Sequence, residues 1–249
     1  MNAIETEIAD LIEISRFAGE RFDLVQAGGG NTSVKLDDGR IFVKASGMAL
    51  SEVSSEADFC LLQWPALLQF LFACDANLSV EALEAQAKVA VAEALTPVAS
   101  NSNSAKRPSI EALLHCLLGK YTLHTHPIAV AALVCRKNWQ KIVKDIFASE
   151  FPQYQDALFL VSYKTPGPAL AVALQQQLRE KNWQPATADR ASLAIVFLEN
   201  HGLIVAGANK QVVMQITNEV VDKLASELAF NLYRYKLVNF ASALVNQVC

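Results

Sequence analysis

The sequence predicts an α/β fold: a single three-layer α/β/α domain, with helices on both faces of a central sheet. A β-hairpin signal lies in the first fifth of the chain, and helical and strand patterns alternate after it. The 249 residues show neither an internal repeat nor a clear linker, so we expect one domain over residues 1–249. Hydrophobic residues make up 52% of the chain and charged residues 18%, which is typical of a compact globule.

The chain opens with a helical pattern and a hairpin pattern. Residues 3–20 carry apolar side chains at near-helical spacing, so we expect an amphipathic first helix. Two apolar segments, residues 32–36 and 40–45, flank the pair Asp38-Gly39. An Asp-Gly pair between two such segments predicts a β-hairpin.

The next part of the chain is mainly helical in pattern. Residues 56–73 indicate a helical or mixed segment with a local break at Trp64-Pro65. Residues 78–95 are rich in Ala and Glu and predict a helix. Residues 96–108 form the most loop-like stretch, and a short helix is expected after them at 109–118.

Strands alternate with helices in the second half. Strands are expected at residues 121–126, 159–163, 194–198 and 203–206, and helices at 128–135, 169–181 and 210–239. Pro127 suits the first turn of the helix that follows it. This mixed order, a hairpin followed by interleaved helices and strands, is the basis for the layered α/β prediction.

Charge and targeting signals exclude several classes of function. The formal net charge is -4 and the sequence has no basic stripe, so a nucleic-acid partner is not expected. The N-terminal residues lack the basic and apolar regions of a secretory signal, and no run is apolar enough to span a bilayer. We therefore expect a cytoplasmic protein with no membrane partner.

Cysteine usage agrees with a reducing compartment. The five cysteines are odd in number and form no CxxC pair. Four of them stand in apolar surroundings and are predicted to be reduced, mostly buried thiols: Cys60, Cys74, Cys116 and Cys135.

Three of the four histidines fall in two short motifs. His124 and His126 are two residues apart in a predicted strand, so their side chains are expected on one face of it. His201 from a later strand end would complete a facial set of three nitrogens and leave one position open, as in catalytic zinc sites. The alternative is that all three are ordinary core or surface histidines, since neither motif is specific alone.

Three further residues near these motifs carry charge or can titrate. Glu111, at the start of a short helix, is a candidate general base beside the metal. The alternative is a first-turn acid that interacts with the helix dipole. His115, one turn later, is predicted to be a helix-face histidine within reach of Glu111, and Lys44 a solvated strand residue.

A glycine cluster at residues 28–33 precedes a strand rather than a helix, so it fails the dinucleotide-binding pattern. Its backbone N–H groups can still hold an anion, although a permissive tight turn is the simpler interpretation. Ser46 with Gly47, and Ser109 at a helix start, could add further donors.

These segments together, and in this order, resemble the class II aldolase/adducin family over nearly the whole chain. The motifs are Gly29-Gly30-Asn31-Thr32-Ser33, Lys44-Ala45-Ser46-Gly47, Pro108-Ser109-Ile110-Glu111, His124-Thr125-His126-Pro127 and Asn200-His201-Gly202-Leu203-Ile204. The resemblance implies a central mixed, largely antiparallel sheet. It also implies a homotetramer with active sites between subunits and a small sugar or sugar-phosphate substrate.

The resemblance further implies a role for each matched residue. His124, His126 and His201 match the zinc ligands, where Mn²⁺ or Co²⁺ could replace Zn²⁺, and Glu111 matches the catalytic acid/base. The substrate or phosphate site is expected at Gly29, Gly30, Asn31, Ser46, Gly47 and Ser109. The implied reaction is reversible retro-aldol cleavage of a ketose, expected to be a ketose 1-phosphate, through a zinc-stabilised enediolate. Family members often use a tyrosine of a neighbouring subunit as proton donor, and none of the five tyrosines here can be assigned that role.

Residues 78–107 form a helical insertion that looks most like aldolase domains fused to short-chain dehydrogenases. The chain departs from the family pattern at Gly28 and Ile110, where hydroxyl side chains are common. Both changes remove a donor, so a phosphate would be held more weakly or the substrate would lack one.

Other functions on the same resemblance are a sugar-phosphate epimerase or dehydratase and a non-enzymatic, adducin-like binding domain. A metal-dependent hydrolase on another fold is the remaining alternative. The epimerase would need an extra carboxylate near the metal, and no residue can be placed there. The binding domain predicts loss of the metal ligands, whereas all three histidines are present.

Overall fold

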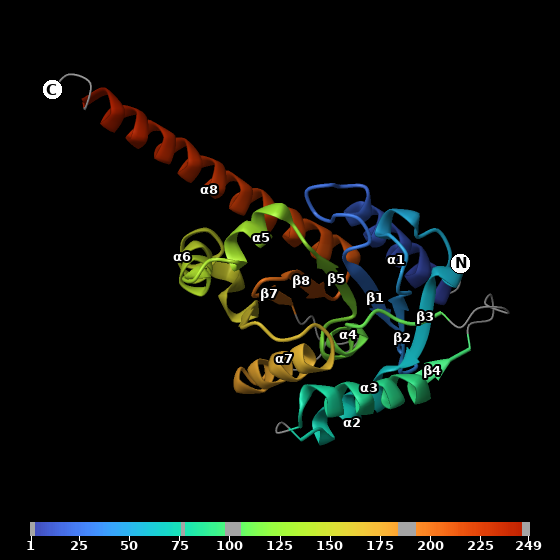
Figure 1. The fold of residues 1–249 in the computed structure, drawn as a ribbon. Helices are drawn as coiled ribbons and strands as arrows, with labels where there is room; N and C mark the ends of the chain where they lie inside the picture. Colours follow the sequence, from blue (N-terminus) through green and yellow to red (C-terminus); the bar gives the residue numbers. More distant parts are fainter. Residues whose placement is uncertain (1–2, 76–77, 98–105, 184–192, 246–249) are drawn as a thin grey trace.

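A computed structural model describes residues 3–75, 78–97, 106–183 and 193–245 (Figure 1). In this part of the chain an eight-stranded sheet has the order β4-β3-β2-β1-β5-β8-β7-β6. The strands are β1 (Asn31–Lys35), β2 (Arg40–Lys44), β3 (Phe59–Gln63), β4 (Leu95–Thr96), β5 (Tyr121–Thr125), β6 (Leu158–Val161), β7 (Ala194–Leu198) and β8 (Gly202–Gly207). Among the strands of the described residues only β6 and β7 pair in parallel, so the predicted mixed, largely antiparallel sheet is confirmed.

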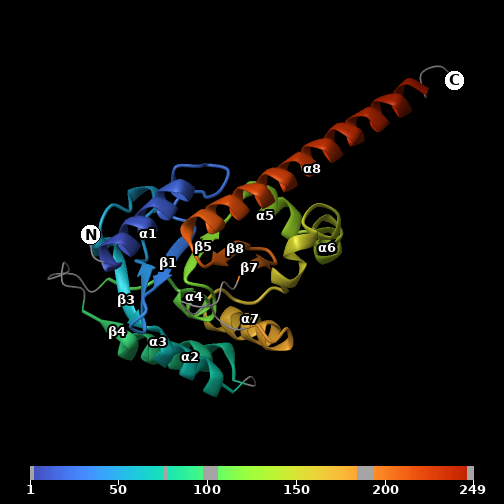
Figure 2. The same ribbon diagram turned by 180° about the vertical axis from the view of Figure 1, so that it is seen from behind.

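Helices cover both faces of the sheet (Figures 1 and 2). On one face lie α1 (Ala3–Gly19), α5 (Ile128–Val134), α6 (Trp139–Glu150) and α8 (Lys210–Val245). On the other lie α2 (Trp64–Ala73), α3 (Val80–Ala94), α4 (Ala112–Leu117) and α7 (Pro168–Glu180). Each helix layer packs on its own hydrophobic core, and the two cores take alternate residues of the strands. This is the three-layer α/β/α arrangement that the sequence predicts.

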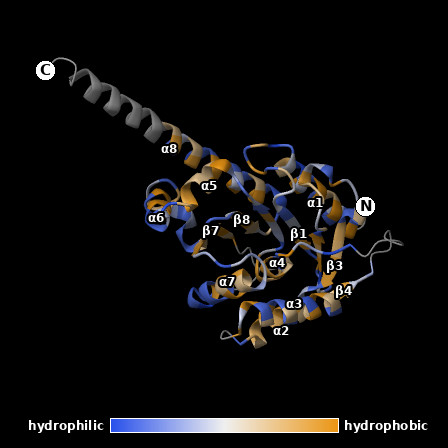
Figure 3. Ribbon diagram, viewed as in Figure 1, coloured by the Kyte–Doolittle hydropathy of each residue, from blue (hydrophilic) through white to orange (hydrophobic). Residues whose placement is uncertain are grey.

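Several helices are amphipathic, as their sequence patterns predict. Helices α1, α6 and α7 carry hydrophilic and hydrophobic residues in turn (Figure 3). Buried Leu11 and Ile14 of α1 pack on the sheet, as do Val143 and Phe147 of α6. Among the described residues, no helix combines the length and apolar character needed to cross a membrane.

The predicted hairpin is present as β1 and β2, which pair antiparallel around Asp38-Gly39. Gly39 has a φ of +88°, a backbone conformation that favours glycine. Strand β1 also pairs with β5, with Asn31 opposite His124. The glycine cluster therefore leads directly into the strand that lies next to the HxH motif.

Several elements differ from the predictions. The segment 56–73 divides at Trp64-Pro65 into strand β3 and helix α2, because a proline suits the first turn of a helix. Helix α6 was not predicted, and α8 extends past residue 239 and projects from the body (Figure 2). The predicted loop at 96–108 lies largely outside the described residues.

Two predictions about individual side chains were wrong. Lys44 is buried rather than solvated, and its ammonium donates to the backbone carbonyls of Ala45 and Met48. Cys135 is exposed at the end of α5, while Cys60 and Cys116 are buried as expected and Cys74 is partly exposed. The apolar residues before Cys135 belong to α5, which turns Cys135 outward where it ends.

Candidate metal centre

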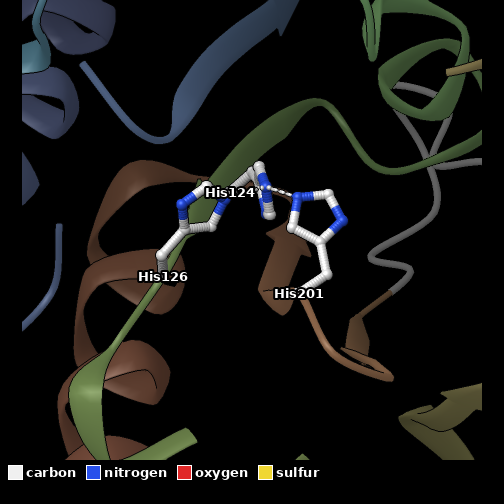
Figure 4. Close-up of side chains that lie close together, drawn as sticks. All are labelled: His124, His126 and His201. Atoms are coloured by element: carbon white, nitrogen blue, oxygen red, sulfur yellow. Dashed lines mark hydrogen bonds between the residues drawn. The ribbon is translucent and has the colours of Figure 1, made fainter. Parts of the chain in front are cut away.

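The three histidines of the two motifs converge (Figure 4). His124 lies in β5 and His126 one residue beyond the end of that strand, while His201 lies in the turn between β7 and β8. Strands β5 and β8 pair with His124 opposite Ile204, which places that turn beside the HxH motif. The Nε2 atom of His124 lies 2.9 Å from Nε2 of His126 and 3.3 Å from Nε2 of His201.

The donor set fits a divalent cation. In a tetrahedral site with metal–nitrogen bonds of about 2.0–2.1 Å, two ligand nitrogens lie about 3.3 Å apart. The measured separations of 2.9 and 3.3 Å approach this value. Each neutral imidazole has one N–H and one lone pair, so a hydrogen bond between two of the three converging nitrogens leaves the third without a partner among them. The described histidine cluster could therefore hold a metal ion.

Hydrogen bonding and burial keep the histidines in a form that can bind metal. Nδ1 of His124 lies 3.0 Å from the carbonyl oxygen of Leu203, which can only accept, so Nδ1 carries the proton and Nε2 keeps its lone pair. Burial is the main cause that lowers the pKa of His124 and of His126 to about 3. Both rings are therefore neutral at ordinary pH and free to act as ligands.

The Glu111 carboxylate also lies beside the histidine nitrogens, and it comes from the helix layer that contains α4. Glu111 directly precedes α4, and its Oε1 lies 3.2 Å from Nε2 of His201 and its Oε2 3.3 Å from Nε2 of His124. The residue is 4% exposed, and in the described part of the chain Oε1 has no hydrogen-bond partner. A carboxylate that accepts only would be repelled by imidazole lone pairs, unless a cation or a proton lies between them.

Asn31 holds the carboxylate in place. Its Nδ2 donates to Oε2 of Glu111 at 2.8 Å and to Oγ of Ser109 at 3.0 Å. Asn31 is itself 4% exposed at the start of β1. The structure thus brings together Asn31, Ser109 and Glu111, which the sequence analysis assigned to one site.

His115 has different partners from those expected. It is fully buried, with Nε2 bonded to Oδ1 of Asn31 and Nδ1 2.7 Å from Oγ of Ser33. The backbone N–H of His115 donates to the carbonyl of Glu111 at 3.3 Å, while among the described residues the imidazole bonds to β1 and not to the Glu111 carboxylate. The missed signal is the alternation of Asn31 and Ser33, which puts both side chains on one face of β1.

The glycine cluster packs against the imidazoles. A Cβ on Gly29 would lie 2.8 Å from Nδ1 of His126, and one on Gly30 would lie 2.7 Å from the carbonyl oxygen of His124. Gly30 also has a φ of +77°. Both glycines therefore allow the loop to approach the histidine cluster more closely than a residue with a side chain could.

Ser46 and Gly47 follow the end of β2. The N–H of Ser46 donates to the carbonyl of Arg107, and the N–H of Ser109 donates to the carbonyl of Lys44. These bonds place the segment after β2 beside the segment before α4. Ser46 and Gly47 are exposed there, so their groups can meet a ligand from solvent.

Comparison with known proteins identifies the family. A family model described as Class II Aldolase and Adducin N-terminal domain matches residues 9–226. The chain belongs to this family. All ten site residues that the sequence analysis named lie within the matched range.

Two class II aldolase structures show the same fold. The N-terminal class II aldolase domain of a conserved protein from Thermoplasma acidophilum is 21% identical. It superimposes with a TM-score of 0.67 over 89% of this chain and 93% of that one. An L-fuculose 1-phosphate aldolase is 18% identical, with a TM-score of 0.55 over 91% and 87% of the two chains.

A curated relative matches over a shorter stretch. The uncharacterized oxidoreductase YuxG of Bacillus subtilis (strain 168) is 30% identical over 118 residues. The matched stretch is 47% of this chain and 15% of YuxG, so this chain corresponds to a small part of that relative. At the family level, membership in the class II aldolases supports an aldolase-type lyase, and such enzymes typically use a divalent metal. The family also includes adducin, which is not an enzyme.

Proposed function

We propose that the protein is a metal-dependent aldolase, a carbon–carbon lyase that reversibly cleaves a ketose 1-phosphate. The observation that carries this proposal is the convergence of three imidazole nitrogens and one buried carboxylate on a single point. An adducin-like binding domain has no need to bury an ionisable Glu111 against three histidines. Membership in the class II aldolase family and the fold shared with an L-fuculose 1-phosphate aldolase support the same reaction type.

His124, His126 and His201 would hold the cation, and imidazole ligands favour zinc, although manganese or cobalt can take such sites. A divalent cation bound there supplies Lewis-acid chemistry, which stabilises negative charge that develops next to a carbonyl group. Glu111 would deliver a proton to the substrate carbon in cleavage and remove it in condensation, because its carboxylate oxygens lie 3.2 Å from Nε2 of His201 and 3.3 Å from Nε2 of His124. Asn31 keeps that carboxylate oriented during the transfer.

We assign binding of the substrate phosphate to the segments around the histidines. The backbone N–H of Gly30, the hydroxyls of Ser46 and Ser109, and the N–H of Gly47 supply uncharged donors. The N–H of Gly29 is donated to the carbonyl of Gln26 at 3.0 Å, so Gly29 contributes room for the loop rather than a donor. Asn31 has no amide hydrogen to spare for this anion, because both are donated to Ser109 and Glu111. We therefore assign Asn31 to orientation within the site rather than to a direct phosphate contact.

We also propose a homotetramer in which subunits meet near this site. Large apolar side chains are exposed on segments next to the histidine and glutamate motifs: Phe22, Ile110, Ile128 and Tyr163. Burial of such side chains between subunits would stabilise an oligomer. Light scattering tests this part, and a monomeric mass would contradict it.

The reaction itself is tested with Glu111→Gln on zinc-loaded protein and a panel of ketose 1-phosphates. The parent is expected to release a three-carbon ketone phosphate. The variant should keep one divalent ion per subunit and lose at least about 100-fold in kcat, because the amide cannot accept the proton. Glu84→Gln, an exposed position on α3, is the matched control and should behave as the parent.

Two other results of these assays would contradict the proposal. Full activity of Glu111→Gln would remove Glu111 from the proton transfer. Formation of an epimer or a dehydrated sugar phosphate, without the three-carbon product, would replace cleavage by another reaction of the family.

A further inference from the structure

We propose that His115 is a positioning residue, which fixes the orientation of the Asn31 amide and through it the Glu111 carboxylate. This inference rests on the proposed function, in which Glu111 transfers the proton. The network itself is a property of the structure. Four of its members are almost fully buried: Asn31, Ser33, Glu111 and His115.

The direction of each hydrogen bond follows from the one before it. The ionised Glu111 carboxylate can only accept, so the nitrogen of the Asn31 amide must face it, at 2.8 Å. The oxygen of that amide therefore faces Nε2 of His115, and because this oxygen only accepts, Nε2 must carry the proton. Nδ1 is then an acceptor, and the Ser33 hydroxyl donates to it at 2.7 Å.

The ring can hold only one proton in this environment. Burial lowers the pKa of His115 to about 3, so the imidazole is neutral and has one N–H. Its tautomer is opposite to that of His124, whose proton lies on Nδ1 and is donated to Leu203. The two rings thus serve different purposes, since one presents a lone pair to the metal centre and the other presents a proton to Asn31.

The positions of these residues in α4 and β1 explain why one ring can reach both partners. Glu111 and His115 are four residues apart around the first turns of α4, so their side chains lie on the same helix face. Asn31 and Ser33 are two residues apart on β1, on one strand face. The α4 face that carries His115 meets the β1 face that carries Asn31 and Ser33. The His115 imidazole is hydrogen-bonded to both of these side chains.

Loss of the Nε2 donor would leave the buried Asn31 oxygen without its partner and so weaken the preference for one amide orientation. An Asn31 amide turned by half a rotation would present its oxygen to the Glu111 carboxylate, and two acceptors would then face each other. The carboxylate would lose its 2.8 Å donor and its fixed place beside His124 and His201. We therefore expect His115 to affect the chemical step rather than metal content.

Two isosteric variants test this. In His115→Gln the side-chain amide nitrogen can replace Nε2 and donate to Asn31, whereas in His115→Asn the shorter amide can replace only Nδ1 and reach Ser33. On zinc-loaded protein we expect His115→Asn to lose about 10–100-fold in kcat, as for other residues that orient a ligand or catalytic group. His115→Gln should stay within about threefold of the parent, and KM and zinc content should be unchanged in both. Equal losses of kcat in His115→Asn and His115→Gln would overturn the proposal. Such a result would point to a general packing defect, which would affect both variants alike.

A second readout does not depend on any reaction. The chain has only four histidines, so long-range ¹H–¹⁵N spectra of the zinc-loaded protein contain four imidazole patterns. We expect one ring with its proton on Nε2 and an unprotonated, hydrogen-bonded Nδ1, and this pattern should vanish in both His115 variants. A proton on Nδ1 of His115 would overturn the network even if cleavage is observed. If the parent cleaves no ketose phosphate, the proposed function fails, and these spectra still decide the network.

Discussion

At the scale of single residues, the histidine cluster depends on glycines that leave room for it. A Cβ on Gly202 would lie 2.4 Å from the backbone oxygen of Thr125 and 2.9 Å from Cδ2 of His126. The Thr125 oxygen cannot move without shifting β5. Glycine at position 202 therefore allows β8 to lie close to the end of β5, where His126 follows. Gly28, by contrast, has open space where a Cβ would stand.

We therefore expect Gly202→Ala to destabilise the protein by about 1–3 kcal/mol, as for overpacking elsewhere, and to weaken metal binding. Urea unfolding and competition with a metal-binding dye measure the two effects. Gly28→Ala is the matched control and should change neither quantity appreciably. Unaltered metal affinity in Gly202→Ala would show that the close approach is not needed.

Ile110 leads to a prediction about the substrate. Its side chain is 64% exposed, directly before Glu111 and beside Gly167, where a hydroxyl would be a further donor to an anion. We expect Ile110→Ser to lower KM for a phosphorylated ketose about tenfold, since a hydrogen bond to a charged group contributes about 1.5–3 kcal/mol. The KM for the unphosphorylated sugar should not change. Val89→Ser, an apolar position on α3 that is 56% exposed, is the control. An equal effect on both sugars would show that no phosphate lies at Ile110.

At the scale of elements, Lys35 ties helix α4 to the sheet. Its ammonium donates to the carbonyls of Cys116 at 2.8 Å and Leu118 at 2.6 Å, at the C-terminal end of α4, and lies over the Trp64 ring. Helix C-terminal carbonyls favour a nearby cation. Because α4 begins directly after Glu111, this anchor helps to place the carboxylate as well.

The anchor has a pH signature. Burial lowers the pKa of Lys35 to about 8, below its value in the unfolded chain. From pH 8 to about 10.4 the unfolded chain keeps the proton and the folded protein loses it, so the Lys35 contribution to the free energy of unfolding rises with pH. The free energy of unfolding of the parent minus that of Lys35→Met should rise over that window, by up to about 1.4 kcal/mol per pH unit.

Urea unfolding at pH 7, 8, 9 and 10 measures that difference. Lys88→Met, on the exposed side of α3, is the control and should give a difference that does not depend on pH. If the free energy of the parent minus that of Lys35→Met stays flat or falls with pH, the Lys35 ammonium is not desolvated as the structure indicates.

Local signals predicted most elements where a single pattern dominates. The Asp38-Gly39 pair located the β1–β2 hairpin, and the helical periodicity of residues 3–20 located α1. Strand β3 was not separated from α2, because the short apolar run at residues 59–62 suits either a strand or a buried helix. Tertiary pairing with β2 decides that it is a strand.

At the scale of the whole molecule, the sheet order explains the site. Strands β1, β5 and β8 are neighbours in the sheet although about 170 residues of sequence separate the first from the last. The glycine loop, the HxH motif and the Asn-His-Gly turn therefore meet at one end of three adjacent strands. The motifs indicated which histidines would cluster. The burial of His115 and Lys35 could not be read from the sequence, because it depends on how α4 packs on β1.

Metal content per subunit tests the central claim most directly, and plasma mass spectrometry measures it on protein purified without a nickel column. His124→Ala removes one proposed ligand, and Lys88→Met serves as a control outside the site. The account predicts about one divalent ion per subunit in the parent and in Lys88→Met, and none in His124→Ala. A parent that holds no ion even after zinc loading, or a His124→Ala variant that holds as much as the parent, would contradict the three-histidine centre.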